Sequence, residues 1–172
     1  VNATEQPFAK HYRMYDYVVT ELPKLVAEHF PVDAARSGIF GHSMGGHGAL
    51  TIALKNPQAY KSVSAFSPIC APMQCDWGKK ALTGYLGDDS EAWSDYDTVA
   101  LLNSRDALIP IKVDQGSDDQ FLKEQLKTEL LEEALVSTGR SGEVQYRDGY
   151  DHSYFFIATF IREHIEFHSK HL

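Results

Sequence analysis

The sequence predicts an α/β fold with a parallel sheet, formed by a single domain over residues 1–172. Short β-prone stretches alternate with helical stretches along the chain, which is typical of βαβ units. The composition, 43% hydrophobic and 23% charged, is that of a folded globular chain. A length of 172 residues suits one domain, and no repeat or flexible linker divides it.

The first half of the chain begins with a predicted helix over about 15–30, where apolar residues recur at helical spacing. Pro23 lies inside this pattern, so either the helix kinks there or a second helix begins. The other elements expected in this half are a buried strand over 37–40, a glycine-rich turn over 41–46, a small-residue helix over 46–55 and a strand over 62–66.

The second half opens with a long stretch, 69–104, that we expect to be irregular apart from short helices near 90–95 and 98–103. A connection of this length suggests an excursion that shapes a site. The elements expected after it are a strand over 109–113, a polar turn over 114–120, an amphipathic helix over 121–136, a strand over 143–147 and a helix from about 154 to the C-terminus.

Charge and cysteine content exclude several classes of function. Lys and Arg number 16 against 24 Asp and Glu, so a net charge of −8 argues against a nucleic-acid-binding protein. No apolar run approaches the roughly 18 residues that cross a bilayer, so no membrane partner is expected. Cys70 and Cys75 lack the spacing of a metal-binding pair, and we expect reduced thiols.

A candidate nucleophile lies between the first strand and the helix after it. Residues Gly41 to Gly45 read GHSMG and match GxSxG, a pattern that is weak alone but sits here in the strand–turn–helix context that it requires. Ser43 would be the nucleophile, and the backbone N–H of Met44 would bind the oxyanion at the helix N-terminus.

A serine nucleophile needs a histidine base and a carboxylate that orients it, and in the α/β-hydrolase fold these follow in the order Ser, Asp, His. His152 lies in a glycine-containing loop after the last predicted strand, which is the position expected of the base. The acid is less clearly marked by the sequence. Asp119 ranks first and Asp118 second, while Asp114 is close to a strand end and Asp151 directly adjoins His152.

Five separated segments together resemble the S-formylglutathione hydrolases of the esterase D family, and the resemblance extends over essentially the whole chain. These segments are Phe40 to Leu50 (FGHSMGGHGAL), Ser64 to Cys70 (SAFSPIC), Trp77 to Gly87 (WGKKALTGYLG), Asp114 to Leu122 (DQGSDDQFL) and Gly149 to Tyr154 (GYDHSY).

The resemblance implies an α/β-hydrolase fold and a Ser43–Asp119–His152 triad that hydrolyses S-formylglutathione, a glutathione thioester, and short-chain esters without a cofactor. It also implies a cytoplasmic enzyme and a possible homodimer. Members of the family carry further strands upstream and a loop that donates a second oxyanion N–H. Because the sequence begins at Val1, we expect an N-terminally truncated domain. The alternatives are a general carboxylesterase, of the acetyl or feruloyl type, and a catalytically silent fragment that needs its missing half.

Other residues have less specific interpretations. Trp77 lies in the long excursion, where it either walls the acyl pocket or packs under a loop. His42 and His47 flank the nucleophile and are expected to be structural. His164, His168 and His171 share a helical face, where a solvated helix end is favoured over a metal site because no acidic or cysteine cluster completes a ligand set.

Overall fold

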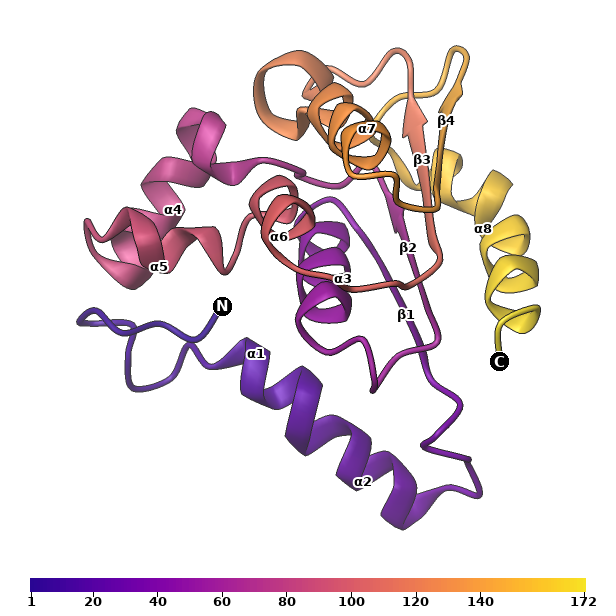
Figure 1. Cartoon of the computed structure of the whole chain (residues 1–172), viewed down its shortest axis with the longest axis horizontal. Helices are drawn as coiled ribbons and strands as arrows, with labels where there is room; N and C mark the ends of the chain where they lie inside the picture. Colours follow the sequence, from indigo (N-terminus) through magenta and orange to yellow (C-terminus); the bar gives the residue numbers. More distant parts are fainter.

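The computed structural model describes residues 1–172 as a parallel sheet with helices on both faces (Figure 1). The predicted α/β fold is therefore confirmed. The sheet has four strands in the order β1-β2-β3-β4, and all neighbours are parallel. The carboxyl ends of the strands consequently lie along one edge of the sheet. The strands are β1 (Gly38–His42), β2 (Ser62–Phe66), β3 (Ile111–Gly116) and β4 (Gly142–Arg147).

Two helical layers enclose the sheet. Helix α3 (Met44–Lys55) packs on β1 and β2, and α6 (Thr98–Ser104) and α7 (Thr128–Ser137) continue that layer (Figure 1). Helix α8 (Tyr154–Ser169) lies on the opposite face, against β2 and β3. The main hydrophobic core comprises 18 buried residues, drawn from the strands and from the α3 layer. None of the helices has the length and hydrophobicity required to cross a membrane.

Three predicted elements of the second half were wrong in extent. The third strand begins at Ile111 rather than at 109, because Pro110 has no N–H to donate to a sheet. The helix expected over 121–136 is interrupted at Lys127, whose φ of 57° is left-handed. The stretch over 69–104 is also more regular than expected: it contains η2 (Pro72–Gln74), α4 (Asp76–Leu86), α5 (Ser90–Ser94) and α6, while η3 (Leu122–Leu126) precedes α7.

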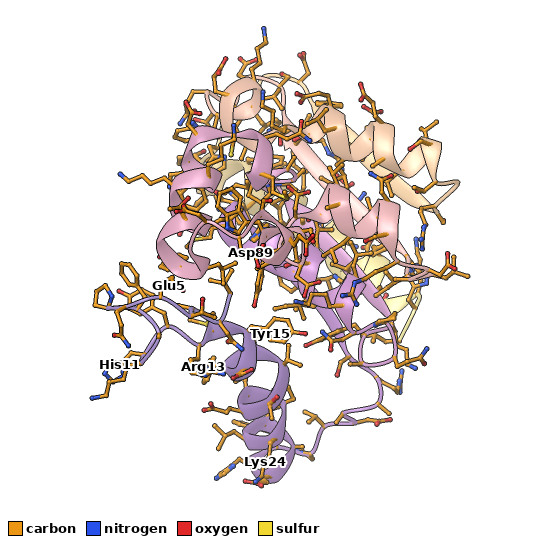
Figure 2. The ribbon with its side chains drawn as sticks, turned by 60° about the vertical axis from the view of Figure 1, so that its left-hand side comes forward. Glu5, His11, Arg13, Tyr15, Lys24 and Asp89 are labelled. Carbon is orange, nitrogen blue, oxygen red and sulfur yellow. The ribbon has the colours of Figure 1, made fainter.

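The N-terminal helical segment extends away from the sheet. It comprises α1 (Met14–Asp16), a π-helical turn η1 (Tyr17–Glu21) and α2 (Leu22–His29). Pro23 lies in the first turn of α2, directly after the π-helical turn, and the helical backbone continues through it. Figure 2 shows Tyr15 at the inner end of this segment and Lys24 at its outer end. No residue of α2 is buried, although the helix is amphipathic.

Strand β1 forms an open edge of the sheet. It pairs only with β2, and its Phe40 side chain is 51% exposed. Large apolar side chains are also exposed on α8, which adjoins β1, at Tyr154 and Phe155. Others are exposed on the N-terminal segment, at Leu25 and, just after α2, at Phe30. Unpaired backbone groups beside exposed apolar side chains are a surface that sheet proteins normally cover.

The last helix carries two histidines that are buried rather than solvated, which corrects the expectation from the sequence. Two serines that face α8 from β2 bind them: Ser64 Oγ lies 2.8 Å from His164 Nδ1 and 2.9 Å from His168 Nε2, and Ser62 Oγ lies 2.7 Å from His168 Nδ1. His164 Nε2 also approaches Asp114 Oδ2, at 3.5 Å. These contacts fix α8 on the sheet.

We expect the protein to lose stability in mild acid because of His168. Burial lowers the pKa of His168 from 6.5 to about 4, so the folded state holds this ring neutral while the unfolded chain binds a proton. The stabilisation is complete above pH 6.5 and is lost as the pH falls towards 4, at a cost of about 3 kcal/mol. Urea denaturation at pH 7 and at pH 4.5 measures this difference in the free energy of unfolding.

His168→Gln retains polar groups for the two serines and removes the titrating ring. The variant is expected to lose the His168 contribution to the pH dependence between 4.5 and 7, leaving a slope from His42 and His47, whose pKa values burial also lowers. The exposed His11, remote from the sheet and replaced in the same way, is the control. An unchanged pH dependence in His168→Gln would show that the ring titrates normally in the folded state.

Candidate active site

Ser43 lies on a strained turn between β1 and α3. Its φ of 55° and ψ of −115° are values that residues with side chains seldom adopt. Backbone hydrogen bonds hold the turn: Ser43 N–H donates to the carbonyl of Phe66 at 2.9 Å, and the Ser43 carbonyl accepts from His47 N–H at 2.9 Å. Strained backbone of this kind clusters at active sites, and here it sits at the carboxyl edge of the sheet.

The turn requires some of its glycines and not others. A Cβ on Gly41 would lie 2.3 Å from the backbone oxygen of Gly45, and one on Gly46 would lie 3.0 Å from the Pro68 side chain. A Cβ on Gly45 would meet nothing within 4 Å. Close packing therefore excludes a larger side chain at Gly41 and leaves little room at Gly46, whereas Gly45, the second glycine of the GxSxG motif, has open space.

Gly41→Ala is expected to destabilise the fold, and Gly48→Ala is the matched control. The alanine at position 41 would collide with backbone that cannot move aside, so we expect a loss of about 3 kcal/mol. Gly48 lies inside α3 with nothing near its Cβ position, so alanine there should raise the free energy of unfolding by about 1 kcal/mol through its higher helix propensity. Chemical denaturation of both variants measures the change in the free energy of unfolding, expected to be a decrease for Gly41→Ala and an increase for Gly48→Ala. Equal changes in the two variants would contradict this description of the turn.

Asp119 and His152 meet across two loops at the same edge. Asp119 Oδ2 and His152 Nδ1 are 2.6 Å apart, and the Asp119 side chain is fully buried. The carboxylate also accepts from the backbone N–H of Phe121 at 2.9 Å and from Gln115 Nε2 at 3.2 Å. Burial alone would raise the pKa of Asp119, but the hydrogen bonds from His152 and Phe121 outweigh it and hold that pKa below its ordinary value.

The other aspartates considered from the sequence are engaged elsewhere. Asp118 is exposed and accepts from the Ser117 hydroxyl. Asp114 belongs to β3, is completely buried and pairs with Arg147 at 2.7 Å. Asp151 is exposed and accepts from the backbone N–H of Ser153. Of the four, Asp119 is the one hydrogen-bonded to His152.

The candidate nucleophile Ser43 and the candidate base His152 are brought near each other by His42. The ring of His42, the residue before Ser43, lies 4.5 Å from the His152 ring, centroid to centroid. The Ser43 hydroxyl makes no hydrogen bond to His152 in this arrangement, and such contacts often tighten only when substrate binds. Met44 is the first residue of α3, so its backbone N–H has no partner within the helix. It lies at the N-terminus of α3, which is the positive end of the helix dipole.

The structure places the remaining candidates as follows. Trp77 lies in the first turn of α4, is 45% exposed and makes none of the aromatic contacts around His152. His47 Nε2 lies 2.6 Å from the Tyr96 carbonyl oxygen, which fits a structural role. Cys70 and Cys75 are both free and buried. The Cys75 sulfur accepts a hydrogen bond from Gly78 N–H and caps α4.

Two residues around the base were not found from the sequence. Gln115 bridges Asp119 to α7, because its amide nitrogen donates to the carboxylate and its oxygen accepts from the Thr128 hydroxyl at 2.8 Å. Phe121 meets the His152 ring edge-on, with centroids 5.1 Å apart. A fully buried glutamine at a strand end is unusual, but its burial is visible only once the fold is known.

Comparisons with known proteins agree with this fold. The chain is 53% identical to an S-formylglutathione hydrolase of Mus musculus and 54% identical to one of Rattus norvegicus, over 177 aligned residues in each case. Both matches cover 100% of this chain, which spans only 62% of the length of each relative.

Solved structures give the same result. An S-formylglutathione hydrolase of Agrobacterium tumefaciens matches with a TM-score of 0.96 and 48% identity, covering 100% of this chain and 62% of that protein. A ferulic acid esterase shares the fold, with a TM-score of 0.74 and 20% identity over 92% of this chain and 61% of its own.

A protein-family model that matches most of the sequence identifies the family. A family model described as "Putative esterase" covers residues 1–167. The strained serine turn, the parallel sheet and the buried carboxylate–histidine pair are all contained in that span. The chain belongs to the esterase family.

Proposed function

We propose that this chain carries the catalytic machinery of a serine hydrolase that cleaves S-formylglutathione to formate and glutathione and also accepts short-chain esters. The observation that carries the proposal is the buried Asp119–His152 pair beside the strained turn at Ser43. Relatives that are 53% and 54% identical and are named S-formylglutathione hydrolases support the choice of a thioester substrate.

The reaction would proceed through an acyl-enzyme. His152 takes the proton of the Ser43 hydroxyl as the oxygen attacks the thioester carbonyl, and Asp119 stabilises the imidazolium that forms. The oxyanion is bound by Met44 N–H. The carbon–sulfur bond then breaks, and His152 protonates the leaving thiolate. A water molecule, deprotonated by His152, attacks the formyl ester, releases formate and returns the proton to Ser43. Amino-acid side chains and one backbone group fill every role, so the scheme uses no cofactor.

The substrate assignment is tested by comparing kcat/KM for S-formylglutathione with kcat/KM for p-nitrophenyl acetate. A thioesterase of this type is expected to prefer the glutathione thioester by at least about tenfold, a difference of about 1.4 kcal/mol in transition-state binding. Equal values, or a preference for acetyl or feruloyl esters of carbohydrates, would identify a general carboxylesterase instead. Because the proposed substrate is a thioester of glutathione, we also propose a cytoplasmic location.

A second candidate is favoured by the open edge of β1. We propose that full activity requires a polypeptide segment that pairs with β1 and covers the apolar residues beside it. The matched relatives are longer than this chain, which covers 62% of them, so their remaining part is the natural partner to test. That part would also have to supply a second oxyanion donor, because Met44 provides one N–H.

Esterase activity and oligomeric state should be measured for the chain alone and after adding the remaining N-terminal part of the mouse relative. Complementation is expected to raise kcat by about 10²- to 10³-fold, the usual effect of one oxyanion donor. The mixture should elute as a one-to-one complex in size-exclusion chromatography. A fully active monomer without the added segment would contradict this second proposal while leaving the hydrolase assignment intact.

A further inference from the structure

Three groups contact the imidazole of His152, two from the loop after β3 and one from β1. Asp119 binds its Nδ1 at 2.6 Å, and the Phe121 ring meets it edge-on with an interplanar angle of 79°. His42, at the end of β1, places a third ring against it, with centroids 4.5 Å apart and an interplanar angle of 42°. His42 is fixed in turn by β1, whose backbone pairs it with Phe66.

The charge state of this pair of imidazoles follows from its surroundings. The Nε2 atom of His42 is buried and has no hydrogen-bond partner. Burial, and then the neighbouring His152, lower the pKa of His42, against the opposing effect of Asp119. Two imidazolium rings in contact repel each other, so the pair takes up its protons one at a time. Asp119 bonds to His152 directly, so a positive charge on His152 would have a carboxylate partner that His42 lacks.

The groups that face the two rings come from each adjoining segment. Asp119 is the acidic group bonded to His152, and Phe121 is uncharged. Asp151, the residue before His152, is exposed and accepts from Ser153 N–H. From α8, Tyr154 lies 6.3 Å from His42, centroid to centroid. No cation other than the histidines themselves is among these contacts. A neutral His42 therefore leaves the Asp119–His152 pair free to accept a proton from a nucleophile.

We propose that His42 is a positioning residue, whose ring holds the His152 imidazole against Asp119 and stays uncharged when His152 is protonated. The inference rests on the proposed function, because it takes His152 as the base of the hydrolytic reaction. It assigns a role beyond packing to the residue before the nucleophile. Since a misplacement of about 1 Å in a catalytic group can cost about 10²-fold in rate, removing this ring should lower kcat.

Three substitutions separate the ring from its charge. His42→Phe keeps the aromatic contact and should retain kcat within about threefold, whereas His42→Ala removes it and should lower kcat about tenfold or more with KM within about twofold. His42→Lys introduces a permanent cation beside His152. It should move the acid limb of kcat/KM to lower pH by about one unit or more, because the charged form of the base is disfavoured.

The same variants can be compared without any turnover, by following the His152 ring protons in a pH titration by NMR. We expect the His152 titration in His42→Lys to shift down by about one unit or more, and that in His42→Phe to shift by less than half a unit. His11→Phe, at an exposed residue remote from the sheet, is the control. Circular dichroism establishes that each variant is folded.

The two readouts keep the proposals distinguishable. If neither the chain alone nor its complex with the added segment hydrolyses either substrate, the proposed function fails and the NMR titration alone decides the role of His42. A folded His42→Lys variant with an unshifted His152 titration overturns the inference. A folded His42→Ala variant with wild-type kcat and pH profile overturns it as well.

Discussion

Ser43→Ala is expected to abolish labelling by a fluorophosphonate probe and to lower the esterase kcat by roughly 10⁴- to 10⁶-fold. The hydroxyl is the one group in the proposed scheme that forms a covalent bond with the substrate, so no neighbour can replace it. The substitution should leave the fold intact, because the backbone hydrogen bonds of the turn do not involve the side chain. Alanine can occupy the strained turn at a cost no greater than that of serine.

Ser104→Ala supplies the matched control for the nucleophile. Its hydroxyl is exposed and donates only to the Ala100 carbonyl within α6, so its loss should change neither labelling nor kcat. Labelling should be measured on the chain alone and on the complex with the added segment, since the second oxyanion donor is expected only in the complex. A folded, complemented protein that the probe modifies at a serine other than Ser43 would contradict the assignment.

The turn at Ser43 illustrates what the sequence can predict. An apolar strand, a run of glycines and a small-residue helix are local signals, and the local backbone depends on them directly. The position of His152 was likewise predictable, because chain order and a loop after the last strand suffice to locate it. The two residues were thus expected at one edge of the sheet before any distance between loops was known.

The choice between Asp118 and Asp119 depends instead on contacts between distant loops. A Cβ on Gly116 would lie 2.2 Å from the Tyr150 carbonyl oxygen, so the two loops pass in backbone contact there. Asp118 N–H donates to that same carbonyl at 3.0 Å, which fixes the turn so that the Asp118 side chain points out and Asp119 points inward. No property of the two adjacent aspartates in the sequence encodes that difference.

Other failures of sequence reasoning have equally definite causes. Helix α4 is capped by the sulfur of Cys75 rather than by an oxygen side chain, and Gly78 and Gly84 lower its helix propensity. The buried His164 and His168 depend on Ser62 and Ser64, which project from alternate positions of β2 towards α8. The cap is local, but sulfur is an uncommon acceptor at a helix N-terminus. The serine–histidine contacts join segments about 100 residues apart, whose proximity only the fold establishes.

Asp119→Asn is the second substitution with a large expected effect, and Asp118→Asn is its control. An asparagine at 119 presents either an amide N–H₂ or a weaker acceptor to His152 Nδ1. The amide donor favours the tautomer with its proton on Nε2, which cannot take a proton from Ser43. We therefore expect kcat to fall about 10⁴-fold at neutral pH. Asp118→Asn alters an exposed carboxylate and should change kcat by less than about twofold.

The mechanism predicts more than a loss of rate in Asp119→Asn. Because the His152 imidazolium loses its carboxylate partner, its titration, followed by NMR in the same variant, should shift to lower pH by about one unit or more. KM should change little, since the Asp119 side chain is fully buried and acts in the proposed scheme only through His152. If Asp118→Asn instead produced the large loss and left His152 titrating differently from the wild type, the carboxylate of the triad would be Asp118, and the 2.6 Å contact of Asp119 would be structural.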